Sequence, residues 1–285
     1  MPSILLCCDL DRTVLPNGNA NESPGVRDLF ASVIKEANII LAYVSGRDLH
    51  LLQQAIADYH IPTPAYAIGD VGTTLYQITD NQWQAQTDWS DHIGVDWQQH
   101  DAAALQEYLD DLPYLTLQEP EKQNIHKLSY YVNLSTPEQT AVREVRQHLD
   151  EHRIKANIIY SIDEIADCGL IDILPQRASK YHAIEFLIDR LGLSKEDTVF
   201  AGDSGNDLPV LISDIPAVLV NNALGSIKNN ARRIADKNGL APQLYLARGG
   251  FFGLNGNYCA GILEGLVHFH PELRPLIANY ARSSG

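Results

Sequence analysis

Short apolar runs that alternate with amphipathic segments constrain the fold of this chain more than any other feature. Residues 4–8 form a continuous apolar run that ends at Asp9, and residues 39–44 form a second run that ends at Ser45. Between them, residues 26–37 place apolar side chains at helical spacing. Continuous apolar runs are typical of strands that are buried on both faces of a parallel sheet. The alternation therefore predicts a doubly wound α/β fold.

The same alternation continues to about residue 72 and resumes near residue 170. Its further members are a helix at 49–59, strands at 66–68, 170–174, 198–201 and 216–220, and a helix at 181–191. Polar residues follow the strands, as in other doubly wound sheets. We expect residues 216–220 to form the last strand of the series.

A different pattern separates the two parts of this series. Helical periodicity at 101–109 and 137–152 is combined with strand-like segments at 126–133 and 157–162. The 126–133 segment alternates apolar and polar residues, which is typical of a sheet with one solvated face. We therefore expect a Rossmann-like core with an inserted α+β cap domain. The expected ranges are 1–87 and 168–285 for the core and 88–167 for the cap.

The charge of the chain excludes some classes of partner. Its 285 residues include 21 basic and 36 acidic side chains, a formal net charge of −15 with His counted as neutral. This surplus argues against a main role in binding nucleic acid or anionic membrane. It does not exclude a small anionic substrate, because a metal ion or a few local cations reverse the field at one site.

Cysteine usage and the start of the chain indicate a cellular compartment. The four cysteines, at positions 7, 8, 168 and 259, have no paired spacing, so we expect no disulfide framework. The first residues lack the basic region of a signal peptide, and no apolar stretch reaches the roughly 18 residues of a membrane span. We therefore expect a cytoplasmic protein.

Polar residues of complementary chemistry follow the predicted strands. They are Asp9 and Asp11, Ser45, Lys180, and Asp203 with Asn206 and Asp207. Ligands of open α/β sheets bind beyond the carboxyl ends of the strands, so we expect these side chains to converge there. Clustered carboxylates repel one another unless a cation lies among them. Mg²⁺ prefers carboxylate oxygens, water and substrate phosphate, and is the cofactor that this cluster predicts.

The paired aspartates indicate a way to use such a site. Asp9 and Asp11 are two residues apart and share a face of an extended segment. One carboxylate can then attack phosphorus to form an aspartyl-phosphate, while the other protonates the leaving alcohol and later activates water. Ser45 and Lys180 are suited to holding the phosphoryl oxygens.

These residues lie in four segments that resemble the four motifs of the haloacid dehalogenase superfamily. In chain order the segments are Asp9-Leu10-Asp11-Arg12-Thr13, Val44-Ser45-Gly46, Lys180 and Gly202-Asp203-Ser204-Gly205-Asn206-Asp207. One departure is Arg12, where the superfamily commonly has Gly. The resemblance implies that Asp9 is the nucleophile, that Asp11 is the acid and base, and that Ser45, Gly46 and Lys180 bind phosphate. It also implies Mg²⁺ held by Asp9, the Asp11 carbonyl and Asp203, with support from Asn206 and Asp207.

The insertion between the second and third motifs is similar to the C2-type cap of the Cof-like branch of that superfamily. Within this branch, residues 69–76, 126–132 and 170–175 resemble sucrose-phosphate phosphatases. The resemblance implies a substrate in the class of disaccharide phosphates and a cap that supplies sugar specificity.

Four further residues are substrate-binding candidates, each with a structural alternative. Lys127 either contacts substrate from the cap or extends along the solvent face of its strand. Asp70 and Thr73 either meet a sugar hydroxyl or close a turn. Arg47 either reaches the substrate or pairs with a surface carboxylate.

The expected function is that of a Mg²⁺-dependent phosphatase acting on a sugar phosphate, such as sucrose 6-phosphate, through an aspartyl-phosphate. Two alternatives stay open at this point. A sugar phosphomutase would use the same aspartates but transfer the phosphoryl group to a second hydroxyl. A non-catalytic phosphosugar-binding module would regulate a sugar synthase. Docking to a sugar-phosphate synthase is compatible with an active phosphatase, but the sequence does not show such a partner.

Overall fold

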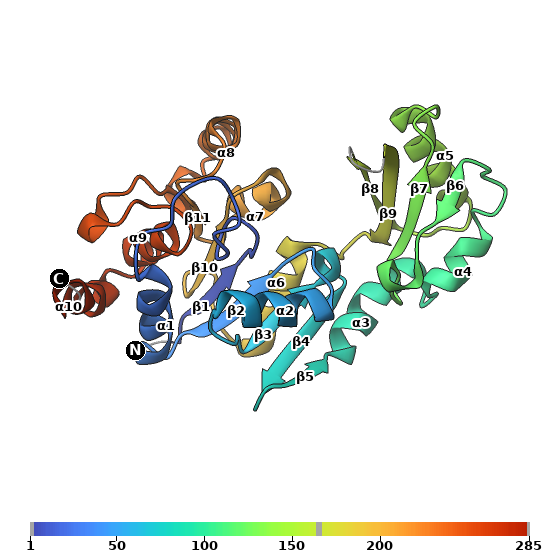
Figure 1. The fold of residues 1–285 in the computed structure, drawn as a ribbon. Helices are drawn as coiled ribbons and strands as arrows, with labels where there is room; N and C mark the ends of the chain where they lie inside the picture. The colour runs from blue at the N-terminus through green and yellow to red at the C-terminus, as the bar shows by residue number, and fades with distance from the viewer. Residues whose placement is uncertain (1–2, 164–166, 284–285) are drawn as a thin grey trace. The chain divides into compact units, whose positions relative to one another are not determined.

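The structure is a computed structural model that describes residues 3–163 and 167–283 (Figure 1). The chain divides into two compact units. The first unit contains Met1–Val71, Tyr76–Gln84 and Ile184–Gly285, and the second contains Gly72–Leu75 and Ala85–Ala183. The predicted domain ranges of 1–87, 88–167 and 168–285 stay a prediction.

The larger sheet contains eight strands and belongs mainly to the first unit. In spatial order they are β12 (Leu244–Leu246), β11 (Ala217–Leu219), β10 (Thr198–Gly202), β1 (Leu5–Cys8), β2 (Ile40–Val44), β3 (Tyr66–Gly69), β4 (Thr74–Thr79) and β5 (Gln82–Ala85). The pairs from β12 to β3 are parallel. All four residues of β1 are buried, as the apolar run predicts for a strand covered on both faces.

The strand order reverses between β1 and β10. From β1 the chain adds β2 and β3 on one side, and later adds β10, β11 and β12 on the other. Leu5 pairs with Ile40 on the first side and with Thr198 on the second. A reversal of this kind opens a crevice at the carboxyl ends of the two strands, where ligands of such sheets bind.

Helices follow most of the parallel strands. They are α1 (Val26–Glu36), α2 (Leu49–Tyr59), α6 (Lys180–Leu191), α7 (Leu208–Leu211), α8 (Gly225–Asn238), α9 (Cys259–Phe269) and α10 (Arg274–Ser283). α9 is buried along most of its length and contacts α1 and the strands β10 to β12 (Figure 1). A Cβ at Gly265 would lie 2.2 Å from Val218 Cγ2, so glycine permits this close approach.

The second unit is built on a four-stranded antiparallel sheet. Its order is β6 (Leu115–Leu117), β7 (Leu128–Val132), β9 (Cys168–Pro175) and β8 (Ala156–Asp163). The helices are α3 (Thr87–Gly94), α4 (Ala102–Glu107) and α5 (Glu138–Glu151). Trp97 is fully buried in a core that also contains Leu128 of β7 and Val145 of α5.

The α/β class with a second α+β unit is confirmed, and two strand predictions are wrong. The segment 170–174, expected in the larger sheet, is part of β9, which pairs with β7 and β8 instead. The segment 216–220 is not the last strand, because β12 follows it at the edge of the larger sheet. Short 3₁₀ turns lie at Asp70–Gly72, Val95–Trp97, Pro120–Lys122, Gly205–Asp207, Ala241–Gln243, Phe251–Gly253 and Pro271–Leu273.

No helix in the described part of the chain is both long enough and apolar enough to cross a membrane.

Candidate active site

Asp9 is the first residue after β1, and its position is fixed by the neighbouring strand. Its backbone N–H donates to the carbonyl of Ala201 at 2.9 Å, which extends the β1–β10 ladder by one residue. The side chain is 6% exposed. The Thr13 hydroxyl donates to Asp9 Oδ2 at 3.3 Å. The parallel pairing therefore places this carboxylate at the reversal point of the sheet.

Asp203 and Asp207 occupy the end of β10 on the other side of the reversal point. Asp207 is fully buried, and its Oδ2 accepts from the Asp203 N–H and the Ser204 N–H, each at 3.1 Å. The Ser204 hydroxyl donates to the same oxygen at 3.0 Å. A Cβ at Gly202 would lie 2.7 Å from Asp207 Cγ, so only glycine lets this carboxylate fold back over the strand end.

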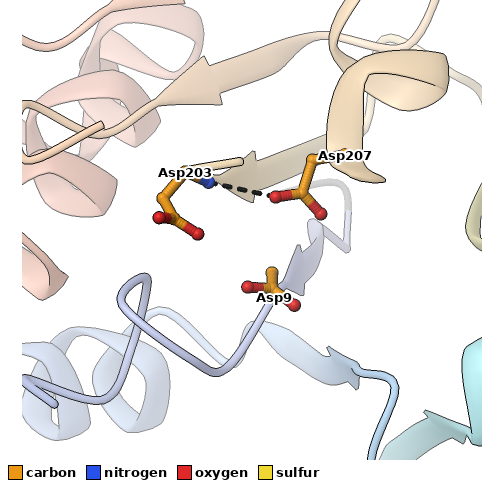
Figure 2. A group of neighbouring side chains, drawn as sticks. All are labelled: Asp9, Asp203 and Asp207. Atoms are coloured by element: carbon orange, nitrogen blue, oxygen red, sulfur yellow. Dashed lines mark hydrogen bonds between the residues drawn. The ribbon is translucent and has the colours of Figure 1, made fainter. Parts of the chain in front are cut away.

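The three carboxylates form one cluster. Asp9, Asp203 and Asp207 each offer an oxygen within 4.8 Å of the other two, and all three residues are buried (Figure 2). Negative charges this close raise the energy of the folded protein unless a cation lies among them. Oxygen ligands alone suit a hard cation such as Mg²⁺. The donor set therefore fits the metal that the sequence predicts.

Asp11 lies apart from this cluster and is held by side chains. Arg47 donates to it through Nε at 2.9 Å and through Nη2 at 2.7 Å, and Asn17 Nδ2 donates at 2.6 Å. The Asp11 side chain remains 42% exposed. The hydrogen bonds to Asp11 raise the pKa of the Arg47 guanidinium above its ordinary value. Of the two alternatives for Arg47, the structure contains the pairing with a carboxylate.

Arg12 adopts a backbone conformation that favours glycine. Its φ is 58°, in the left-handed region. The Arg12 N–H donates to Asn17 Oδ1 at 2.8 Å, and its Nε lies 3.3 Å from Asp203 Oδ2. The conformation gives a physical reason for a glycine at this position of the motif, because a side chain is strained there.

Ser45 and Gly46 follow β2. Ser45 is 1% exposed, and its hydroxyl accepts from the Arg47 N–H at 3.2 Å. The nearest atom to a Cβ at Gly46 would be Val71 Cγ2 at 3.9 Å, so packing alone does not require glycine there. Asp48 then caps α2 by accepting from the Leu51 N–H at 2.9 Å.

The other predicted site residues lie at several places. Asn206 is exposed, and its Oδ1 accepts from the Ser204 hydroxyl. Asp70 follows β3 with a φ of 50° and donates its N–H to the Arg47 carbonyl. The remaining three, Thr73, Lys127 and Lys180, belong to the second unit.

Within the second unit, these residues have different surroundings. Thr73 is 3% exposed, and its hydroxyl accepts from Asn124 Nδ2 at 2.9 Å. Lys127 exchanges backbone hydrogen bonds with Asn124 in a tight turn before β7. Lys180 is the first residue of α6 and is 6% exposed.

Three side chains that hold the predicted site residues were not themselves predicted. They are Thr13, Asn17 and Ser204. Ser204 had a readable signal, because Ser-x-x-Asp before a short helical turn is a capping pattern and the structure contains both of its bonds. Thr13 belongs to the first motif and Asn17 to no motif. The bonds that each of them makes could not be read from the sequence, because they depend on the path of the loop after β1.

The chain is similar to known sugar-phosphate phosphatases over most of its length. Residues 2–270 match the family described as sucrose-6F-phosphate phosphohydrolase. A mannosylfructose-phosphate phosphatase from Agrobacterium fabrum is 27% identical over 94% of this chain and 97% of its own length. A protein of Nitrosococcus oceani, described only as a HAD-like hydrolase, is 53% identical over 95% of this chain and 73% of its own.

Solved structures with the same fold include a sucrose-phosphatase. The enzyme from Synechocystis, solved in complex with sucrose and phosphate, has a TM-score of 0.70 and 25% identity. The match covers 95% of this chain and 99% of that one. A haloacid dehalogenase-like hydrolase from Bacillus subtilis has a TM-score of 0.65 at 17% identity, covers 93% of this chain and 91% of its own, and supports the fold alone.

Proposed function

This chain belongs to the sucrose-6F-phosphate phosphohydrolase family of sugar-phosphate phosphatases, and from that premise we propose that it is a Mg²⁺-dependent phosphatase of a disaccharide phosphate. The observation that supports the chemistry is the buried cluster of Asp9, Asp203 and Asp207 at the reversal point of the sheet. The substrate class is supported by the names of two relatives, a mannosylfructose-phosphate phosphatase and a probable sucrose-phosphatase. Sucrose and mannosylfructose are both disaccharides.

The side chains suited to hold Mg²⁺ are Asp9 and Asp203, with Asp207 in support. The resemblance of the first and fourth motifs adds the carbonyl of Asp11 as a ligand and Asn206 as a further supporting residue. When bound, the ion would neutralise charge on the phosphoryl oxygens and on the aspartates. Asp207 orients the backbone amides of Asp203 and Ser204, so it acts through the turn that carries Asp203.

The proposed reaction has two steps. In the first, an Asp9 oxygen attacks phosphorus and the bond from phosphorus to the sugar oxygen breaks. Asp11 gives a proton to that oxygen, so it has to take up this proton and loosen its two bonds from Arg47 beforehand. In the second, Asp11 takes a proton from water, the water oxygen attacks phosphorus, and the bond to Asp9 breaks. Inorganic phosphate and the free sugar are the products, and both aspartates return to their starting states.

Further residues are assigned roles in the same proposal. Ser45, Gly46 and Lys180 bind the phosphoryl oxygens through a hydroxyl, a backbone N–H and an ammonium. The candidates for sugar contacts are Arg47, Asp70, Thr73 and Lys127. Arg47 has to loosen its pairing with Asp11 to contact a sugar, and the Thr73 hydroxyl has to give up its bond from Asn124.

We propose that the reaction takes place in the cytoplasm, as the sequence predicts. We propose no synthase partner. The comparisons do not support such a partner.

Phosphate release from a panel of sugar phosphates tests the proposal. The panel contains sucrose 6-phosphate, mannosylfructose phosphate and hexose monophosphates, each assayed with Mg²⁺ and with EDTA. We expect turnover of a disaccharide phosphate that is lost in EDTA and in Asp9→Asn. The exposed carboxylate in Asp28→Asn is the matched control and should leave turnover unchanged.

Other outcomes would contradict the proposal in distinct ways. Equal turnover of hexose monophosphates would contradict the disaccharide class but keep the mechanism. Transfer of phosphate to a second sugar hydroxyl, without release, would identify a mutase. Binding without any turnover, unchanged in Asp9→Asn, would identify a binding module.

A further inference from the structure

Asn222 bridges two segments that are distant in sequence. It follows β11, and its Nδ2 donates to the carbonyl of Arg12 at 2.6 Å. Its Oδ1 accepts from the backbone N–H of Tyr258 at 2.8 Å. One amide side chain therefore joins the loop after β1 to the residue before α9.

The Arg12 carbonyl lies in the middle of a tight turn formed by residues 9–15, here called the Asp9 turn. The carbonyl of Leu10 accepts from the N–H groups of Thr13, Val14 and Leu15 at 3.1, 3.0 and 2.9 Å. Thr13 in turn donates its hydroxyl to Asp9. Arg12 Nε lies near Asp203 on the far side of the reversal point. The turn therefore sets the positions of groups on both sides of the carboxylate cluster.

The other end of the bridge is one of the most buried parts of the molecule. Tyr258 is 0% exposed and has a φ of 51° and a ψ of −132°. α9, which begins at the next residue, is held close to the sheet, because a Cβ at Gly265 would lie 2.2 Å from Cγ2 of Val218 in β11. A helix packed in this way moves little relative to the sheet. Residues anchored to it can therefore hold the reacting side chains in productive geometry.

A second set of asparagines binds the same loop farther from the cluster. Asn255 and Asn257 donate their Nδ2 groups to the carbonyl of Asn21 at 2.8 and 3.0 Å. Asn255 also donates its N–H to Ser23 Oγ at 3.0 Å. These bonds hold the end of the loop next to α1, outside the Asp9 turn, and give a matched control for Asn222.

We propose that Asn222 is a positioning residue for the Asp9 turn, which it holds at the Arg12 carbonyl so that Asp9, Asp11 and Thr13 keep their places relative to Asp203. The inference rests on the proposed function for its effect on catalysis. The restraint of the Asp9 turn by Asn222 is independent of that function, because it is supported by the two hydrogen bonds of the Asn222 side chain.

The test uses Asn222→Asp, which keeps the size of the side chain and an acceptor for Tyr258 but removes the donor to Arg12. Asn257→Asp makes the same chemical change at the Asn21 carbonyl. For Asn222→Asp we expect kcat to fall about 10- to 100-fold with KM within about twofold, because displacements of about 1 Å have effects of that size. For Asn257→Asp we expect both constants to stay within about twofold of the parent values.

A neutral variant separates geometry from charge. Asn222→Leu lacks both hydrogen bonds and adds no carboxylate beside the Arg12 carbonyl, and it should lower kcat at least as much as Asn222→Asp. A normal kcat in Asn222→Leu would mean that the added charge caused the loss, and would overturn the proposal. Equal losses in Asn222→Asp and Asn257→Asp would overturn it as well, because a general loosening of the loop would then explain both.

Amide hydrogen exchange tests the proposal by a measurement that does not depend on enzymatic activity. In both Asn222 variants the amides of Thr13, Val14 and Leu15 should exchange about tenfold faster or more, and in Asn257→Asp they should not. Unchanged exchange in the Asn222 variants would overturn the proposal. If the parent protein releases no phosphate from any substrate, the proposed function fails, and the exchange rates still decide whether Asn222 restrains the turn.

Discussion

The two sides of the carboxylate cluster are built by different kinds of contact. On the β10 side, Asp207 accepts hydrogen bonds from residues three and four positions before it. On the β1 side, Asp11, two residues beyond the cluster residue Asp9, is held by Arg47, which lies 36 positions away. The first side is therefore set mainly by local backbone geometry, and the second by side chains, one from the same loop and one from a distant element.

This difference has a consequence for how each side responds to change. A buried carboxylate fixed by backbone N–H groups cannot turn to water when a contact is lost, so changing it or its neighbours alters the site directly. A half-exposed carboxylate fixed by two side chains can lose one partner and keep the other. We expect substitutions on the β10 side to remove activity, and substitutions around Asp11 to reduce it.

Asp203→Asn should have the largest effect. It removes one of three clustered charges and should lower turnover on the order of 10³-fold, as the loss of one preorganised electrostatic contact does. In EDTA the free energy of unfolding should change by no more than about 1 kcal/mol, because relief of carboxylate repulsion offsets the loss of the Arg12 contact. Phosphate release and chemical denaturation measure the two effects. A metal-free Asp203→Asn protein that is much less stable than its parent would contradict the view that the cluster is held under repulsion.

Arg47→Met should have a smaller effect on activity. It removes both guanidinium bonds to Asp11 and leaves the bond from Asn17, so kcat should fall about 10- to 100-fold. The kcat of Arg47→Lys should lie between that of Arg47→Met and that of the parent, because an ammonium group cannot reproduce the bidentate contact with Asp11. The matched control is Arg143→Met, whose side chain is 69% exposed and lies 3.7 Å from Glu144. Steady-state kinetics on the best substrate measures all three, and a loss in Arg47→Met as large as in Asp203→Asn would erase the contrast between the two sides.

Gly202→Ala tests the local side through packing. The added Cβ would meet Asp207 Cγ at 2.7 Å in a fully buried position, so the free energy of unfolding should fall by about 1–3 kcal/mol. Gly205→Ala is the control for stability, because its Cβ would meet nothing closer than Ile227 Cδ1 at 3.7 Å. Urea denaturation of both variants gives the comparison. Equal stability of the two would show that the turn after β10 accommodates the methyl group.

The same contrast explains which parts of the fold were predictable. β1, β2 and β10 are short apolar runs buried on both faces, and the sequence pattern identified each of them. β12 has three partly exposed residues at a sheet edge and gave no such signal. β9 was identified as a strand but placed in the wrong sheet, because its apolar content suits either sheet and only the pairing with β7 and β8 distinguishes them.

The candidate site follows the same rule. Asp9, Asp203 and Asp207 were expected together because parallel strands end at one edge, and the structure groups these three. The partner of Arg47 was left open, because it depends on how the loop after β1 folds back over the strand ends. The contact between Asn222 and Arg12 joins residues 210 positions apart, and no local pattern indicates it.

Arg12 combines a local backbone constraint with a side-chain contact to a residue distant in sequence. Substitutions of Arg12 should change the free energy of unfolding less than the other substitutions change stability or activity. Its φ of 58° favours glycine, whereas its half-exposed guanidinium contacts Asp203. Arg12→Ala keeps the backbone strain and loses the contact, and should lower the free energy of unfolding by about 0.5–1 kcal/mol. Arg12→Gly loses the contact but relieves the strain, and should be about 1 kcal/mol more stable than Arg12→Ala. Urea denaturation in EDTA compares the two variants without any contribution from bound metal. A higher free energy of unfolding for Arg12→Ala than for Arg12→Gly would contradict this prediction. It would mean that residue 12 is not strained in the left-handed conformation in solution.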